Sequence, residues 1–144
     1  MQIKKYRQST ILRRTRPLDL DVVVGQAALH RVVGGAKILA AQLRHLADMS
    51  THDNISVRIL PFEAGFPGGM SMLPFVVMDF GTPPPGEPSE PPVVYLEGAV
   101  GSMYLEDDAD VRFHYQAYRT ICQAALDEVT SRNLLRQRTR EITS

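Results

Sequence analysis

The segment from residue 83 to residue 92 restricts the fold of this chain more than any other segment. Six of its ten residues are proline, which has no backbone N–H and a fixed φ, so this stretch suits neither a helix interior nor a central strand. We predict an extended and exposed Pro-rich loop over residues 83–92. The core must therefore be built from the segments before and after it.

The length and composition of the chain are those of a small globular protein. The chain has 144 residues, of which 44% are hydrophobic and 22% are charged, as is typical of one globular domain. We therefore treat residues 1–144 as a single domain. Cys122 is the only cysteine, so an internal disulfide is excluded. No signal peptide and no apolar run of about 20 residues is present, so we expect no membrane contact and a cytoplasmic location.

Charge is unevenly distributed along a chain whose net charge is zero. Residues 1–18 carry six Lys or Arg residues and no acid, and the last sixteen residues carry four Arg residues and one Glu. Basic ends can contact nucleic acid. Neither end matches a DNA-reading motif or interleaves aromatic residues with its charges. We therefore favour solvated helix faces over nucleic-acid contact by this chain.

Hydrophobic periodicity predicts the elements. Alternating or β-branched runs predict strands, and apolar residues three and four apart predict helices. Before the Pro-rich loop, we expect helices over 3–15, 26–33 and 36–50, with strands over 18–24, 55–62 and 73–80. After it, we expect a strand over 93–97 with a short extension over 103–105, then a long helix and a last helix starting at Thr130 or Ser131. The stripe of the long helix is Val111, Tyr115, Tyr118, Cys122, Ala125 and Val129.

These elements predict an α+β fold: a small mixed β-sheet of three to five strands with helices packed on it. A strand, two helices and a strand in succession allow a crossover between parallel neighbours. The turn-rich residues 65–69 separate the 55–62 and 73–80 strands, which we expect to pair antiparallel.

No catalytic motif is present. The chain has no zinc-protease, Walker A, dinucleotide-binding or nucleophile-elbow pattern, so we assign no catalytic, cofactor-binding or metal-binding residue and predict that the protein is not an enzyme. The four histidines lack zinc-site spacing, so we interpret them as surface residues. Cys122 lies on the apolar stripe of its predicted helix, where we interpret it as an inert core thiol rather than a nucleophile.

Three side chains remain candidates for binding a partner. Phe66, Met70 and Met72 lie near the turn at 65–69, and methionine is over-used at adaptable binding surfaces. Core and interface are equally good interpretations of these three residues, so both stay open here.

An ordered set of segments resembles a known family. The chain resembles the domain of unknown function found C-terminal to the helix-turn-helix module in actinobacterial, antitoxin-like, XRE-type transcriptional regulators. The likeness covers nearly the whole chain and is carried by the combination of these segments: Arg7-Gln8, Ile11-Leu12, Val22–Gly35, Gln42-Leu43, Leu46, Asn54–Phe62, Pro74-Phe75, Val94–Glu97 and Tyr104–Asp110.

The resemblance implies a non-catalytic effector or protein-partner-binding domain of a transcriptional regulator. In that family the gene often lies beside that of a small partner protein, and a helix-turn-helix module contacts the DNA. We therefore expect this chain to bind the small product of an adjacent gene or a second copy of itself, and to contact DNA only through an associated helix-turn-helix module. The alternative function is sensing of a small molecule in a pocket between sheet and helices. Two departures matter: the chain begins near the family's Arg-Gln helix, so we expect the helix-turn-helix module to be absent, and Gln26 stands where the family usually has an acid.

Overall fold

The computed structural model describes residues 18–69 and 71–143. The helix expected over residues 3–15 therefore lies outside the described residues. The chain divides into two compact units. In the described part, unit 1 holds residues 18–64 and 124–143, and unit 2 holds residues 65–69 and 71–123.

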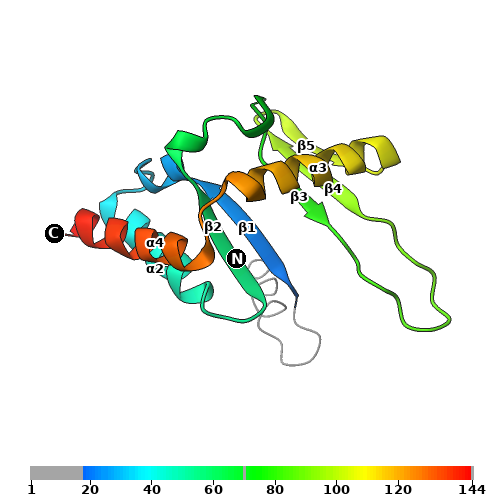
Figure 1. Cartoon of the computed structure of the whole chain (residues 1–144), viewed down its shortest axis with the longest axis horizontal. Coiled ribbons are helices and arrows are strands. Elements are labelled where there is room, and N and C mark those ends of the chain that lie inside the picture. Colours follow the sequence, from blue (N-terminus) through cyan, green and yellow to red (C-terminus); the bar gives the residue numbers. More distant parts are fainter. Residues whose placement is uncertain (1–17, 70, 144) are drawn as a thin grey trace. The chain divides into compact units, whose positions relative to one another are not determined.

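Unit 1 is a two-stranded parallel sheet with two helices (Figure 1). Its elements are β1 (Leu20–Gly25), the 3-10 turn η1 (Gln26–Leu29), α2 (Ala36–Met49), β2 (Ile55–Leu60), the 3-10 turn η2 (Phe62–Ala64) and α4 (Glu128–Thr143). The register pairs Leu20 with Ile55 and Gly25 with Leu60. The crossover through η1 and α2 joins these parallel neighbours, as the sequence allows, but the helix expected over 26–33 is only the 3-10 turn Gln26–Leu29.

The core of unit 1 lies between the sheet and the helices α2 and α4. Alternation in β2 places Ile55, Val57 and Ile59 on one face, and all three are buried. They pack in one cluster with Leu43 of α2 and Leu135 of α4. Because the stripe of α2 repeats at helical spacing, one side of that helix reaches the core while the other remains exposed.

The backbone of Ile59 joins β2 to the C-terminal part of unit 1. Its N–H donates to Oγ of Ser131 at 2.9 Å, and its carbonyl accepts from the N–H of Leu126 at 2.8 Å. In a parallel strand, the N–H and carbonyl of one residue point to the same side. The Ser131 hydroxyl and the Leu126 N–H therefore satisfy the Ile59 backbone groups on the edge of β2 that faces away from β1.

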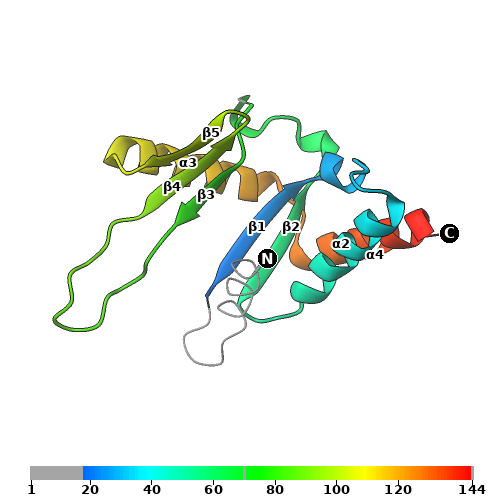
Figure 2. The same cartoon turned by 180° about the vertical axis from the view of Figure 1, so that it is seen from behind.

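Unit 2 is a three-stranded antiparallel meander with one long helix (Figure 2). Its elements are the 3-10 turn η3 (Pro67–Gly69), β3 (Phe75–Met78), β4 (Val93–Gly98), β5 (Gly101–Leu105) and α3 (Asp108–Ala124). β4 is the central strand, pairing with both neighbours. Residues 83–92 contain no helix or strand and form part of the long connection between β3 and β4.

The α+β class is confirmed, with the five described strands in two sheets. The predicted pairing of residues 55–62 with 73–80 is wrong, since β2 pairs with β1 and β3 pairs with β4. The reason lies in residues 61–74. Two 3-10 turns and positive φ values at Gly65, Gly68 and Gly69 occupy the segment that a tight hairpin would have to span.

The helical boundaries after β5 also differ from expectation. The long helix ends at Ala124, and Val129, expected in its apolar stripe, is 61% exposed. Asp127, rather than Thr130 or Ser131, caps α4: its Oδ1 accepts from the Thr130 N–H at 2.7 Å. This hydrogen bond and that from the Thr130 hydroxyl lower the pKa of the Asp127 carboxyl. A carboxylate is also favoured by the positive end of a helix.

Leu135 should be a principal support of unit 1, because it is fully buried between α4, α2 and β2. We expect Leu135→Ala to lower the free energy of unfolding by about 2–5 kcal/mol through lost burial and a cavity. The control Val129→Ala, on the same helix but exposed, should change it by less than about 0.5 kcal/mol. Urea denaturation of both variants checks this, and equal effects would contradict the assignment of the buried face.

Candidate functional site

The outer face of the meander in unit 2 carries large apolar side chains. Successive residues of a strand point to opposite faces, and the register places Val76, Tyr95 and Tyr104 on one face, directly across the strands from each other. The Tyr95 and Tyr104 ring centroids lie 5.2 Å apart. Val76 is 52% exposed and Tyr104 is 63% exposed. We call these three residues the outer apolar patch.

The opposite face of the same sheet packs against α3. Val94 of β4 is fully buried there, and the Phe75 ring lies 5.1 Å from the ring of His114 on α3. His114 is itself buried, and its Nδ1 lies 2.7 Å from the carbonyl oxygen of Asp110. The interpretation of all four histidines as surface residues is therefore wrong for His114. Since α3 already provides the core of unit 2, the outer patch is not needed for that purpose.

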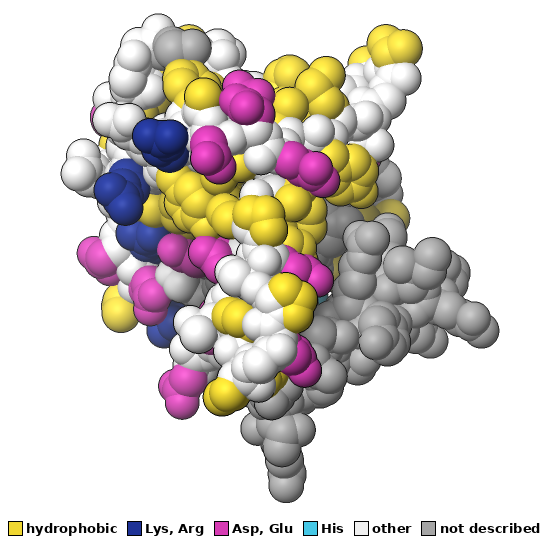
Figure 3. Space-filling view, turned by 90° about the vertical axis from the view of Figure 1, so that its right-hand side faces the viewer, with side chains coloured by type: hydrophobic (Ala, Val, Ile, Leu, Met, Phe, Trp, Pro, Cys, Tyr) yellow, Lys and Arg dark blue, Asp and Glu magenta, His cyan; other side chains and the backbone are white. Residues whose placement is uncertain are grey.

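Polar residues border the outer apolar patch. Glu97 and Ser102 are paired across β4 and β5, two residues beyond Tyr95 and two residues before Tyr104, and are therefore on the same face. Figure 3 shows one face of the molecule, on which hydrophobic side chains lie beside both acidic and basic side chains. An apolar centre with a polar rim is the usual composition of a protein interface.

One hydrogen-bond pair fixes the start of the long connection after β3. Oδ1 of Asp79 accepts from the Gly81 N–H at 2.8 Å, and Oδ2 accepts from the Tyr115 hydroxyl of α3, also at 2.8 Å. The hydrogen bonds from Gly81 and Tyr115 lower the pKa of the Asp79 carboxyl. Burial, with the Asp79 hydrogen bond and charge, raises the pKa of Tyr115 to about 12. The connection is thus anchored to α3 beside the sheet.

The residues predicted to bind a partner are less well placed than the outer patch. Phe66 is 68% exposed, Met72 is half-buried, and Met70 lies outside the described residues. Phe66 lies between the turns η2 and η3, and Met72 lies in the irregular segment before β3. The hairpin on which the sequence placed them is not formed. Whether they bind a partner stays a prediction.

A hollow of about 480 Å³ lies in unit 1 at the end of the sheet where β1 and β2 begin. Its lining comes from the sheet, from the loop after α2 and from α4, and includes Asp19, Thr51, Asp53, Ser56 and Arg132. Arg132 is held in place, since its Nε and Nη2 donate to the Ser50 Oγ and carbonyl oxygen at 2.8 Å. The hollow lies at the end of the sheet rather than between the sheet and the helices, where the packed core lies, so the expected pocket between sheet and helices stays a prediction.

Sequence reasoning missed the outer apolar patch, although its signal was present. β4 and β5 were both expected near their observed positions, and each carries a tyrosine. Only the register, which pairs Tyr95 with Tyr104, puts the two rings on one face. Counting alternation outward from the two-residue turn at 99–100 would have found that pairing.

Residues 18–69 and 71–143 contain no helix long and apolar enough to cross a membrane. The same residues contain no cluster of three or more His, Cys, Asp or Glu side chains that could hold a metal ion. A family model described as a domain of unknown function, DUF5753, matches residues 1–137. No curated protein and no solved structure matches the chain.

Removing the Tyr115 hydroxyl should raise the pKa of Asp79, because the ionised carboxylate loses one of its two hydrogen bonds. We expect Tyr115→Phe to move that pKa toward its ordinary value. The remaining hydrogen bond from the Gly81 N–H should still hold the pKa of Asp79 below that value. In the wild type, the Asp79 contribution to stability is present above pH about 4 and is lost as pH falls through its lowered pKa. NMR titration of the carboxyl carbon checks this, with Tyr104→Phe as the control. An unchanged Asp79 pKa in Tyr115→Phe would refute the coupling.

Proposed function

The chain belongs to the DUF5753 family of domains of unknown function, and we propose that it is the protein-partner-binding domain of an antitoxin-like, XRE-type transcriptional regulator. In this proposal the domain is non-catalytic and cytoplasmic. It contacts DNA only through a helix-turn-helix module and not through its own residues. The regulatory context rests on the resemblance described above.

The outer apolar patch is the observation that carries the proposal. An antiparallel sheet with one face on its core normally has polar side chains on the other face. Here that second face presents a valine and two tyrosines at adjacent register positions. Tyrosine gives large contact area and a hydroxyl for hydrogen bonding, and it is enriched at protein interfaces. An exposed group of this kind supports binding of a protein partner.

The partner in this proposal is a second copy of the chain or the small product of an adjacent gene. A flat face of three strands suits either partner, since both would bury the aromatic rings in a central position where interface energy concentrates. The long connection between β3 and β4 is anchored at its start by Asp79 to Tyr115 of α3, the helix that covers the opposite face.

A second candidate function is favoured by the hollow at the start of β1 and β2. Its volume of about 480 Å³ falls in the range of small-molecule sites. Hydroxyl, carboxylate and guanidinium groups line it, so a polar ligand would find both donors and acceptors. Under this alternative, the domain would sense a small molecule, and variants in the outer apolar patch would leave the response unchanged.

Partner binding should depend on the outer apolar patch. We expect the double variant Val76→Thr/Tyr104→Ser to weaken self-association, or capture of the purified adjacent-gene product, by at least about tenfold, since exposed aromatic anchors dominate such interfaces. Sedimentation equilibrium measures the first, and a binding titration measures the second. The matched control is Val33→Thr/Phe62→Ser, which removes an exposed valine and an exposed aromatic ring from unit 1.

The outcomes separate the functions. Loss of partner binding in the patch variant, with partner binding retained in the control, supports the partner-binding domain. Equal binding by wild type and patch variant contradicts the assigned surface. A ligand that binds the wild type and is lost on Ser56→Tyr, which would fill the hollow, favours the sensor.

We also expect no sequence-specific DNA binding by this chain at about 150 mM salt. Lys and Arg contacts to phosphate give binding that weakens with salt and ignores sequence. A titration with operator and scrambled duplexes checks this. Nanomolar discrimination between the two duplexes would contradict the proposed division of labour.

A further inference from the structure

A second hollow, of about 260 Å³, lies between α2 and α4 of unit 1, and among the described residues its lining consists of arginines and threonines. The lining residues are Arg44, Arg136, Thr139, Arg140 and Thr143. We call it the arginine cleft. It lies in a different unit from the outer apolar patch, so it requires an explanation of its own.

Helical spacing explains why these side chains converge. Four of the five belong to α4, and their separations of three and four residues place them on one face of the helix. Arg44 faces them from α2. The bottom of the cleft is held in place by packing, because Thr139 is buried and the two helices share the core that contains Leu43 and Leu135. Three arginines therefore line one cleft between two packed helices.

Acidic side chains compensate little of the positive charge of the cleft, although Arg140 lies in the last turn of α4, at the negative end of the helix dipole. An arginine side chain remains protonated in proteins. Arg136 has one acidic neighbour, with its Nη2 3.9 Å from Oδ1 of Asp48, at the outer limit of an ion pair. In the described part of the chain, no hydrogen bond or ion pair is found for the guanidinium groups of Arg44 and Arg140. A bound anion would offset this repulsion.

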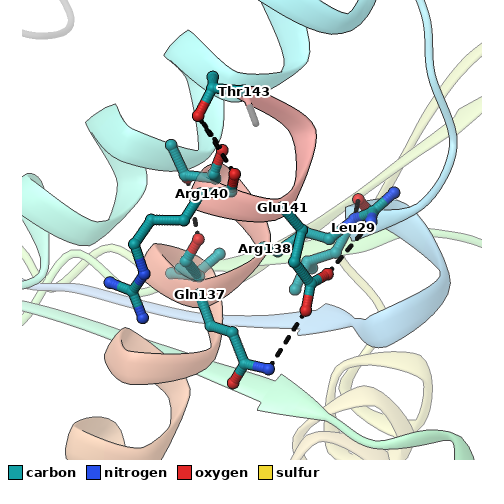
Figure 4. Close-up of polar contacts among 8 residues, drawn as sticks. Leu29, Gln137, Arg138, Arg140, Glu141 and Thr143 are labelled. Atoms are coloured by element: carbon teal, nitrogen blue, oxygen red, sulfur yellow. Dashed lines mark hydrogen bonds and ion pairs between the residues drawn. The ribbon is translucent and has the colours of Figure 1, made fainter.

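The neighbouring arginine shows the contrast. Arg138 donates from Nε to the carbonyl oxygen of Leu29 at 3.1 Å, and its Nη1 lies 3.3 Å from Oε2 of Glu141. Its role is structural. Figure 4 shows the Arg140 side chain extending away from the Arg138–Glu141 pair, on another side of α4. Glu141 thus pairs with Arg138 and also accepts a hydrogen bond from Gln137 at 3.2 Å, and Arg140 lines the cleft.

The threonines narrow the class of ligand. The hydroxyl of Thr139 donates to the carbonyl oxygen of Leu135 at 2.9 Å, and that of Thr143 donates to the carbonyl oxygen of Thr139 at 2.9 Å. Their hydrogens are used inside the helix, so the arginines supply the donors of the cleft. The guanidinium fork matches the oxygens of phosphate and carboxylate in pairs. Three such forks suit the multiple charges of a phosphate or diphosphate better than one carboxylate.

We propose that the arginine cleft binds the phosphate or diphosphate group of a small phosphorylated ligand. The volume of about 260 Å³ lies just below the usual range for whole drug-sized ligands, so the charged group enters the cleft and the rest of the ligand lies outside. A single concave site with converging arginines suits a compact anion. A duplex would instead require basic residues in a row along its backbone.

Pyrophosphate is the probe that tests this inference. Titration calorimetry with the full chain at constant ionic strength should give binding by the wild type, together with a rise in Tm that grows with pyrophosphate concentration. Arg44→Gln and Arg140→Gln should each weaken binding by about tenfold or more. Arg140→Lys keeps the charge but loses the fork, and it should also weaken binding. The control is Arg119→Gln, an exposed arginine of α3, which should bind like the wild type.

Three results would overturn the inference. They are no pyrophosphate binding at millimolar concentration, equal losses in the cleft variants and the Arg119→Gln control, and displacement of pyrophosphate by a scrambled DNA duplex at about 150 mM salt. The last would assign the cleft to nucleic-acid phosphates. Circular dichroism and Tm without ligand exclude misfolding of a variant. Since partner binding is read from the outer apolar patch variants, the two proposals fail independently.

Discussion

The hydrogen bonds of Ile59 are the constraint on which unit 1 depends. A two-stranded parallel sheet leaves backbone donors and acceptors unpaired along both edges, and buried groups of this kind are costly. The Ser131 hydroxyl and the Leu126 N–H satisfy the Ile59 groups on the edge of β2 that faces away from β1. They also fix where α4 starts, so Leu135 reaches the core and the arginines of α4 lie opposite Arg44. Two hydrogen bonds thus set both the packing and the position of the arginine cleft.

Local periodicity predicted the elements well where a single face is buried. The buried stripe of α2 and the alternation of β2 follow directly from Leu39, Leu43, Ile55, Val57 and Ile59, because hydrophobic spacing reports which face meets a core. Strand partners were less predictable. Whether residues 55–62 pair with an earlier or a later strand depends on how residues 61–74 fold, and glycines with positive φ and short 3-10 turns leave only a weak trace in hydrophobic pattern.

The candidate sites depend on contacts between elements, which is why sequence reasoning missed them. Tyr95 and Tyr104 become neighbours only through the β4–β5 register. Arg44 and Arg140 are 96 positions apart and become neighbours only through the packing of α2 on α4. By contrast, Phe66 and Met72 attracted attention because they are close in sequence, and the irregular backbone between η2 and β3 does not align them on one strand.

Unit 2 interrupts unit 1 in the sequence, since residues 65–123 lie between β2 and α4. During synthesis, β1, α2 and β2 leave the ribosome first, but their core lacks Leu135 until α4 has followed. Unit 2, made of consecutive residues with a meander of near neighbours, can close earlier and with a lower loop-closure entropy. Unit 2 can therefore fold before unit 1 is complete, while the part of the β2 face that packs on α4 remains exposed. Translation speed after residue 123 would then decide how long that face is exposed to aggregation or to a chaperone.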